Sequence, residues 1–598
     1  MDIFAIIKLL GGLAMFLYGI EIMGDGLKNS SGAALKKVLE KVTGNVLVGV
    51  LTGTLVTAVI QSSTATIVLT VALIGAGVLS LRQAVSIVLG ANIGTTITAQ
   101  IIRLMDIDSN GNMVLEFCKP ENLAPIALVV GIILIMFVKR KSVKTVGDIF
   151  IGFGILFSGL LNMTAAVTPL SDSPEFAAVL ARFAGNPLLG ILSGLVLTVV
   201  VQSSSAMVGM LQALSSTGAM TFSMVYPVIM GINLGTCVTT AMVCSIGSSK
   251  DAKRTGVVHI AFNTIGTILF MIVMTILQKN SLFGDSFWTK AVDSGGIANF
   301  QTVFNVITAI ALLPFTNQLV KLSKVIVKED KPEDLPHPEL HTLDPKLYIS
   351  PAVAVSEATK AVAAMGTIAK ENFARGCEQL FKYDAGTVKK IDQDEDCLDT
   401  FADTSDHFLI GLSKAVESEQ EDRQLDMLMQ VVPNFERVGD YATNLVELSQ
   451  RLSADGGSFS DMAKQELRII CGAVNEILSM TVDAFSRDDK RLVRKIEPFE
   501  EVIDDMVMIL RDRHTKRLKA SACSVNSGLV FMETLTYLER ASDQCSSIAV
   551  MMMSRDNETI LQNHYEYLRE LHAGNDQEYL AEKECRRKQY IDALKNIG

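Results

Sequence analysis

A polar tetrad inside a long apolar tract constrains this chain more than any other feature of its sequence. It reads Gln-Ser-Ser-Thr at residues 61–64, and it returns 141 positions later as Gln-Ser-Ser-Ser at residues 202–205. An ungapped overlay of residues 45–99 on residues 186–240 has 19 identical pairs in 55 positions. Shared apolar composition would not keep the same Gly, Asn, Gln, Ser and Thr in register. The sequence therefore predicts a duplicated membrane unit.

The duplication extends beyond the tetrads in both directions along the chain. Downstream, a block that reads G-x-N-x-G-T occurs at residues 90–95 and again at residues 231–236. Upstream, with a one-residue shift, it pairs glycines of the first apolar segment of each unit: Gly12 with Gly152, and Gly19 with Gly159. We expect the two units to cover about residues 1–140 and 141–330.

The doubled tetrad and the doubled G-x-N-x-G-T block resemble those of the type II sodium/phosphate cotransporters and their bacterial relatives. The resemblance covers residues 1–330. It implies a polytopic all-α membrane domain that couples the movement of inorganic phosphate to sodium. It also implies that the tetrad residues contribute to both the substrate site and the sodium sites.

The apolar segments divide into full spans and shorter pieces. A helix needs about 20 residues to cross a hydrocarbon core of about 30 Å. Each tetrad has only about 16 apolar residues on either side, which is roughly 24 Å of helix. We expect each tetrad to join two half-helices in a re-entrant hairpin near the membrane midplane. Two short, tilted spans joined at the tetrad are the alternative. Segments long enough to span are 3–23, 83–102, 122–138, 146–163, 222–245, 256–277 and 301–322.

The distribution of Lys and Arg between the loops predicts the orientation. One alternate set of loops carries 15 of these residues and the other set carries 5. If the first set is cytoplasmic, the N-terminus lies outside and residue 330 lies inside. The two hairpins then enter from opposite sides, which defines an inverted-topology repeat. We expect a multi-pass protein in the lipid bilayer of a bacterial plasma (inner) membrane.

The polar residues of the repeats suit an anion and a cation together. Helix N-termini offer free N–H groups and a favourable dipole to a phosphate, and hydroxyls add further donors. Sodium needs oxygen ligands, which Gln, Asn and Thr side chains and unwound backbone supply. No Lys or Arg lies in these segments, so sodium itself is expected to offset the charge of phosphate. Close helix packing is the alternative role for small and hydroxyl residues. The candidate ligands are Gln61, Ser62, Ser63, Thr64, Asn92, Thr95, Gln202, Ser203, Ser204, Ser205, Asn233 and Thr236.

The second part of the chain has the composition of soluble helices. A proline-rich linker is expected at residues 331–347, because its prolines stand among charged residues and cannot continue a helix. Residues 345–598 hold 31 Lys and Arg against 44 Asp and Glu, and this excess carries the whole net charge of −11. That balance argues against nucleic-acid binding, and the loop orientation, with residue 330 inside, makes this part a cytoplasmic domain.

This acidic part is also duplicated. The pattern E-x-x-x-D at residues 395–399 recurs at 500–504, and E-R-x-x-D at residues 436–440 recurs at 539–543, with offsets of 105 and 103. Units of this length fit three-helix bundles. The pattern resembles the PhoU family of phosphate-signalling proteins, which implies two such bundles over residues 348–598 and bound metal ions.

Carboxylates four residues apart lie on one helix face and repel each other. Two such pairs on adjacent helices could together hold a hard cation, whose identity the spacing does not reveal. The alternative is a solvated acidic face with Arg437 and Arg540 in local ion pairs. The candidate metal ligands are Glu395, Asp399, Glu436, Asp440, Glu500, Asp504, Glu539 and Asp543.

These features predict a secondary active transporter for inorganic phosphate and sodium, with a cytoplasmic PhoU-like domain that regulates it and binds a regulatory partner. A membrane phosphate sensor and a phosphate exporter of the same fold are the alternatives. A channel lacks an obvious ring of pore-lining charge. We expect no enzymatic activity, since the chain has no P-loop and its His337 and His341 lie in the linker.

Overall fold

The computed structural model divides into two compact units, residues 1–332 and 333–598, which are described separately. Regular secondary structure in the described residues is helical, apart from an isolated bridge between Thr221 and Ala291. The prediction of an all-α fold is thus confirmed. The structure describes residues 3–40, 45–75, 78–106, 116–117, 119–169, 178, 182–183, 186–245, 250–280, 282, 284–328, 337–416, 418–454, 457–520, 523–557, 560, 563–572 and 576–597.

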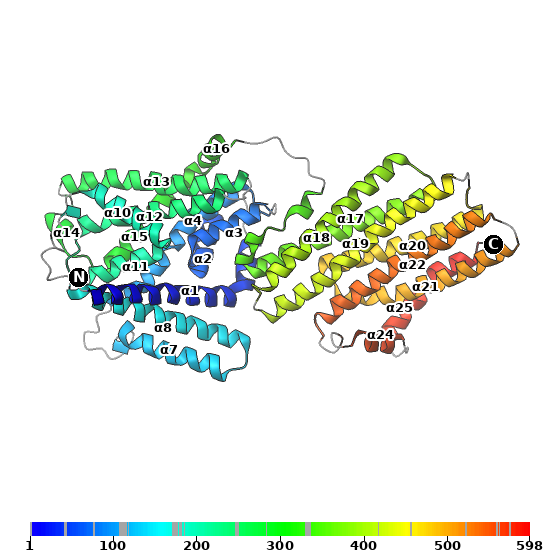
Figure 1. The fold of residues 1–598 in the computed structure, drawn as a ribbon, viewed down its shortest axis with the longest axis horizontal. Coiled ribbons are helices and arrows are strands. Elements are labelled where there is room, and N and C mark those ends of the chain that lie inside the picture. Colours follow the sequence, from blue (N-terminus) through cyan, green and yellow to red (C-terminus); the bar gives the residue numbers. More distant parts are fainter. Residues whose placement is uncertain are drawn as a thin grey trace. The chain divides into compact units, whose positions relative to one another are not determined.

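The first unit is a bundle of apolar helices (Figure 1). Seven of its described segments are long and apolar enough to cross a membrane, and each coincides with a span expected from the sequence. Two further helices of this length and hydropathy lie in the second unit, where their apolar faces pack inside bundles. The helices of the first unit are α1 Ile3–Glu40, α2 Val46–Ile60, α3 Ser63–Gly75, α4 Leu81–Gly94, α5 Thr96–Ile102, α7 Pro120–Phe137, α8 Lys141–Val167, α10 Pro187–Val201, α11 Ser204–Ser215, α12 Phe222–Ser245, α13 Lys250–Lys279, α14 Asp285–Thr289, α15 Ser294–Leu312 and α16 Thr316–Ile326.

Four short helices flank the two tetrads. Helices α2 and α10 each have 15 residues, about 22 Å, which is too short to cross a bilayer. Both begin at an asparagine whose side chain caps the first turn: Asn45 accepts from the Leu47 N–H, and Asn186 accepts from the Leu189 N–H. Both end at the tetrad glutamine, so the chain breaks where the sequence predicts it.

The break has the same backbone conformation in both units. Gln61 and Gln202 have φ values of 59° and 56°, in the left-handed region that non-glycine residues rarely occupy. In the first unit the Thr57 hydroxyl donates to the Thr66 hydroxyl at 2.9 Å. These two residues lie one turn before and one turn after the break, so the start of α3 folds back beside the end of α2.

Glycines repeat the helix packing of one unit in the other. Gly90 of α4 lies against the carbonyl of Val50 in α2, and Gly231 of α12 lies against the carbonyl of Ile191 in α10. A Cβ atom at either glycine would overlap that carbonyl. Close approach of these helices therefore requires glycine at both positions. The same correspondence holds at two further pairs of positions. Gly53 lies against Ile87, and Gly194 lies against Val228. Gly94 lies against Thr57, and Gly235 lies against Thr198.

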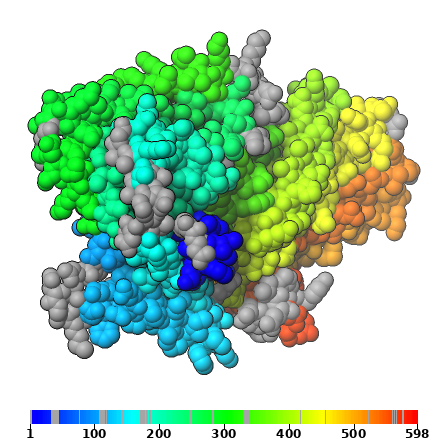
Figure 2. Space-filling view, turned by 60° about the vertical axis from the view of Figure 1, so that its left-hand side comes forward, coloured from blue at the N-terminus to red at the C-terminus, as the bar shows by residue number. Residues whose placement is uncertain are grey.

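The first helices of the two units pack against each other. Gly12 of α1 lies against the backbone of Gly159 in α8, and Gly19 lies against the backbone of Gly152. The two helices are therefore antiparallel, and equivalent glycines exchange partners as they would around a two-fold axis. Helix α1 and the α7–α8 pair also lie at the outer surface of the first unit (Figure 2).

The second unit contains two three-helix bundles, as the sequence predicts. Helices α17, α18 and α19 form the first bundle and α20, α21 and α22 form the second, and the bundles meet through α19 and α22. Helix α25 packs on α21. The bounds are α17 Pro351–Gln379, α18 Ala385–Ser413, α19 Glu419–Ala454, α20 Asp461–Arg487, α21 Lys490–Lys519, α22 Val525–Ser554, α24 His564–His572 and α25 Gln577–Lys595.

The expected linker at residues 331–347 lies partly outside the described residues, which resume at His337. From there the chain forms two 3-10 turns, Pro338–His341 and Pro345–Ile349, which pack on α17 and α18. Leu340 and Leu347 are buried in this contact.

Candidate functional site

The first tetrad forms a capped helix start beside a buried glutamine. The Gln61 side-chain oxygen accepts a hydrogen bond of 2.7 Å from the Thr98 hydroxyl of α5, and the Gln61 amide donates to the Ala58 carbonyl. The Ser62 hydroxyl accepts from the Ala65 N–H at 3.2 Å and caps α3. Ser63 is buried in the first turn of α3, and Thr64 is half-buried.

The second tetrad has the same backbone plan with a more open glutamine. The Ser203 hydroxyl accepts from the Ala206 N–H at 3.2 Å and caps α11. Ser204 is buried and Ser205 half-buried, whereas Gln202 is exposed. The two tetrads therefore share helix N-termini with free N–H groups, while their glutamines differ in environment.

The G-x-N-x-G-T blocks lie on α4 and α12 and carry buried asparagines. The Asn92 amide donates to the Val88 carbonyl at 3.0 Å, which leaves its side-chain oxygen as an acceptor. Asn233 is also buried, and its amide nitrogen has no hydrogen-bond partner among the described residues. The threonine hydroxyls of the blocks donate within their own helices, Thr95 to Ala91 and Thr236 to Asn233.

Helix contacts bring the two units together around these residues. Helix α3, which carries the first tetrad, packs against α12 of the other unit. Helix α11, which carries the second tetrad, packs against α5, which continues α4. Helix α3 thus contacts the helix that carries the G-x-N-x-G-T block of the other unit, and α11 contacts the helix that directly follows that block. The two units offer helix N-termini and hydroxyls for an anion, and the amide oxygens of α4 and α12 for a cation.

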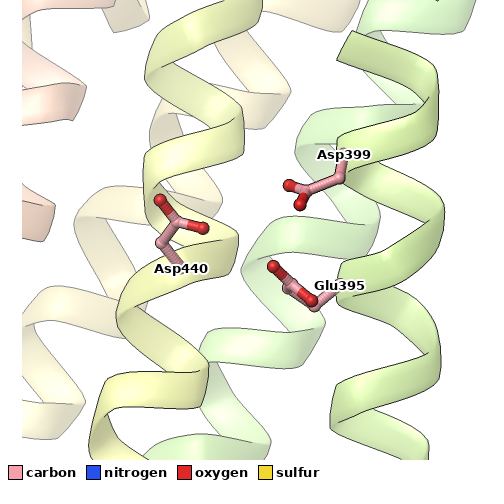
Figure 3. A group of neighbouring side chains, drawn as sticks. All are labelled: Glu395, Asp399 and Asp440. Atoms are coloured by element: carbon pink, nitrogen blue, oxygen red, sulfur yellow. The ribbon is translucent and has the colours of Figure 1, made fainter. Parts of the chain in front are cut away.

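A second candidate site consists of three carboxylates in each bundle of the second unit. In the first bundle, Glu395 and Asp399 extend from α18 toward Asp440 on α19 (Figure 3). Their carboxylate oxygens lie within 4.8 Å of one another. In the second bundle Glu500, Asp504 and Asp543 form the equivalent group, also within 4.8 Å.

Burial and mutual repulsion raise the pKa values in both groups. Desolvation, followed by the charges of Asp399 and Asp440, raises the pKa of Glu395 to about 7. Desolvation, followed by the charge of Asp543, raises the pKa of Asp504 to about 6. The pKa of Glu500 is also raised by desolvation and by Asp504.

Two predicted ligands lie outside the three-carboxylate groups. Glu539 forms an ion pair of 2.6 Å with Arg511. Glu436 is not part of the first group, although desolvation and Asp440 raise its pKa. The charge of Arg437 acts to lower the pKa of Asp440, and that of Arg540 acts to lower the pKa of Asp543, yet desolvation raises both pKa values. Clustered carboxylates whose pKa values stay raised match the donor set of a hard divalent cation.

Sequence reasoning missed Glu497, which lies beside the second group. This buried residue accepts hydrogen bonds from the Ser546 hydroxyl and from the His572 ring of α24, and its charge raises the pKa values of Glu500 and Asp504. Its position three residues before Glu500 places it on the same helix face, which was the available signal.

Comparison with known proteins matches both parts of the chain. Residues 15–165 and 166–291 each match the Na+/Pi-cotransporter family, and residues 362–449 and 467–552 each match the PhoU domain. No solved structure matches the chain significantly.

Curated relatives match different portions of the chain. YjbB of Escherichia coli (strain K12), named provisionally as an inorganic phosphate export protein, is 22% identical over 92% of this chain and 98% of its own length. YqeW of Bacillus subtilis (strain 168), an uncharacterized protein, is 28% identical over 53% of this chain and 96% of its own. Human sodium-dependent phosphate transport protein 2B is 33% identical over 24% of this chain and 21% of its own.

Proposed function

We propose that the protein is a secondary active transporter, because residues 15–165 and 166–291 match the Na+/Pi-cotransporter family and residues 362–449 and 467–552 match the PhoU domain. It couples inorganic phosphate to sodium across a bacterial plasma membrane. The observation that carries this proposal is the doubled tetrad, which stands in both units at a helix break and opens a new helix N-terminus.

Phosphate binds at these N-termini. The free N–H groups of the first turns of α3 and α11 donate to its oxygens, and the hydroxyls of the buried Ser63 and Ser204 add donors. Thr64 and Ser205 border the same turns.

Sodium takes uncharged oxygens around the tetrads. The side-chain oxygens of Gln61, Asn92 and Asn233 and the carbonyls at the helix breaks are suited to this role. Bound sodium offsets the charge of the anion, since no Lys or Arg stands in either motif. The proposed sodium ligands also include Gln202, Thr95 and Thr236.

The repeats lie in the membrane with opposite orientations, the N-terminus outside and the PhoU domains in the cytoplasm. The antiparallel contact between α1 and α8 and the Lys and Arg bias of the loops support this topology. Two related units facing opposite sides supply the two access states that a transporter needs.

The PhoU domains regulate transport. Glu395, Asp399 and Asp440 would hold a divalent cation in the first domain, and the equivalent group would hold one in the second, where the ion neutralises clustered charge. A cytoplasmic partner binds this part of the protein.

Export is the second candidate for the direction of flux. It is favoured by the similarity to YjbB, which extends over 92% of this chain and is named as an export protein. A sensor without transport is the remaining alternative, and it would not require two tetrads in two units.

Replacing tetrad serines tests the function. We expect Ser63→Ala and Ser204→Ala each to lower sodium-dependent uptake of labelled phosphate by vesicles at least about tenfold, because each removes a buried donor to a charged ligand. Ser193→Ala is the matched control, since the Ser193 hydroxyl of α10 donates to the Gly190 carbonyl of its own helix. Wild-type uptake in both tetrad variants would refute the site.

A further inference from the structure

Two buried polar side chains on α13 belong to neither tetrad nor G-x-N-x-G-T block. His259 and Asn263 are 0% and 1% exposed, and their spacing of four residues places them on one face of the helix. Helix α13 is one of the apolar segments long enough to span a membrane. Polar groups buried in such a helix are costly without partners, so their contacts indicate a role.

The Asn263 amide connects the two asparagine-bearing helices. Its Nδ2 lies 3.5 Å from the Oδ1 of Asn92 on α4. The Asn263 side chain also contacts the thiol of Cys237 on α12, four residues after Asn233. Cys237 in turn contacts the Asn233 carbonyl at 3.9 Å. Asn263 therefore stands between equivalent positions of the two units.

The same amide has two nearer acceptors on its own helix. Asn263 Nδ2 lies 3.2 Å from the His259 Nε2 and 3.2 Å from the His259 carbonyl. An amide nitrogen carries two hydrogens, whereas three oxygen or nitrogen acceptors lie within 3.5 Å of this one. The Asn92 oxygen is the most distant of the three, so it is the acceptor that the amide gives up most easily.

We propose that Asn263 and His259 are positioning residues of the membrane site. This proposal rests on the proposed sodium-coupled function. With no cation bound, Asn263 donates to the Asn92 oxygen and holds its orientation. When sodium takes that oxygen, the amide transfers to His259 Nε2. With His259 as an alternative acceptor, the buried Asn263 amide keeps a partner both with and without bound sodium. If that amide lost its partner when sodium bound, the loss would oppose sodium binding.

This role requires a particular form of the imidazole. Nε2 must accept, so the ring is neutral and its hydrogen lies on Nδ1, which is buried without a hydrogen-bond partner among the described residues in both states. A side chain with an oxygen near the position of Nε2 can take over, whereas a ring without an acceptor cannot. Glutamine and phenylalanine at residue 259 therefore separate the acceptor function of the imidazole from its volume.

The test is the apparent sodium affinity of phosphate uptake in vesicles, measured together with the maximal rate and the thermal stability of each variant. We expect Asn263→Leu to raise the half-saturating sodium concentration about tenfold, the effect of one lost buried hydrogen bond. His259→Phe should raise it about threefold or more, and His259→Gln should restore it to within about twofold of wild type.

Asn305→Leu is the matched control. Asn305 is an equally buried amide on α15, and its Nδ2 donates to the Gln301 carbonyl of its own helix. We expect its sodium dependence to stay within about twofold of wild type. If Asn263→Leu does not insert, Asn263→Thr replaces it, because its shorter side chain cannot reach Asn92 and should produce the same rise.

Two outcomes overturn this inference alone: an Asn263 variant with wild-type sodium dependence, or identical sodium dependence in His259→Phe and His259→Gln. Wild-type protein without any sodium dependence would instead overturn the proposed function and this inference with it. The two failures are distinguishable because only the second concerns the wild-type protein.

Discussion

The carboxylate groups of the PhoU domains make the stability of the second unit depend on pH and metal. Two full charges 4.8 Å apart repel by about 3.5 kcal/mol at an effective dielectric constant of about 20. Desolvation, followed by this repulsion, raises the pKa of Asp504 from 3.8 to about 6. A shift of that size corresponds to about 3 kcal/mol, and solvent screening of the partly exposed group reduces it to about 1–2 kcal/mol.

The sign follows from proton binding. The folded-state pKa of Asp504 lies above its unfolded-state pKa, so at pH values between these two the folded state binds more protons than the unfolded state. The contribution of Asp504 to the unfolding free energy is fully present at pH values below its unfolded-state pKa and is lost as the pH rises through about 6. For Glu395 the loss continues through about 7. Metal-free protein should therefore lose about 1 kcal/mol of unfolding free energy per carboxylate group between pH 5 and pH 8, because part of the Asp504 shift lies below pH 5.

The assay is urea unfolding of residues 333–598, followed by circular dichroism with a chelator at both pH values. At pH 8 a divalent cation at about 100 times its dissociation constant should add about 2.7 kcal/mol per site. Asp504→Asn should stabilise the metal-free protein at pH 8 and lose the gain from metal in the second bundle. Asp512→Asn, which removes an exposed ion pair with Lys516, is the control. Stability that stays constant or rises from pH 5 to pH 8 without metal would refute the reasoning.

Three further predictions concern the membrane unit. Gly90→Ala should reduce the amount of folded protein, because the added methyl group overlaps a backbone carbonyl, whereas Gly75→Ala, where the methyl group meets open space, should not. Fluorescence-detected size exclusion measures the yield of both variants, and equal yields would contradict the packing. A single cysteine at Lys139 should resist an impermeant thiol reagent in intact cells while one at Asn280 reacts, and the reverse pattern would invert the proposed topology. A protein truncated to residues 1–328 should still couple phosphate to sodium in vesicles, and complete loss of transport after correct insertion would make the PhoU domains part of the transport machinery.

The tetrads show how far the sequence alone could lead. Polar residues in an apolar tract predict a helix break, and the structure has left-handed glutamines at Gln61 and Gln202. Repeated glycines predict close packing, because few other side chains let two backbones touch. The sequence could not show that Gln61 is buried against Thr98 while Gln202 is exposed, since that difference depends on neighbouring helices from distant parts of the chain.

The acidic half shows the same limit. A spacing of four residues places Glu395 and Asp399 on one helix face, and the structure brings them together. Which carboxylate of the next helix reaches them depends on the crossing of the two helices, so Asp440 joins the group and Glu436 does not. No sequence motif includes Asn263, and a single amide in an apolar helix does not reveal which helix it faces, so its contact with Asn92 could not be predicted.

Uptake of labelled phosphate by vesicles that contain the purified protein tests the central claim most directly. An inward sodium gradient should drive phosphate above its equilibrium level, and a potassium gradient of the same size should not. Dissipation of the sodium gradient with an ionophore should release the accumulated phosphate. Equal uptake in sodium and potassium, or none in either, would contradict sodium-coupled phosphate transport.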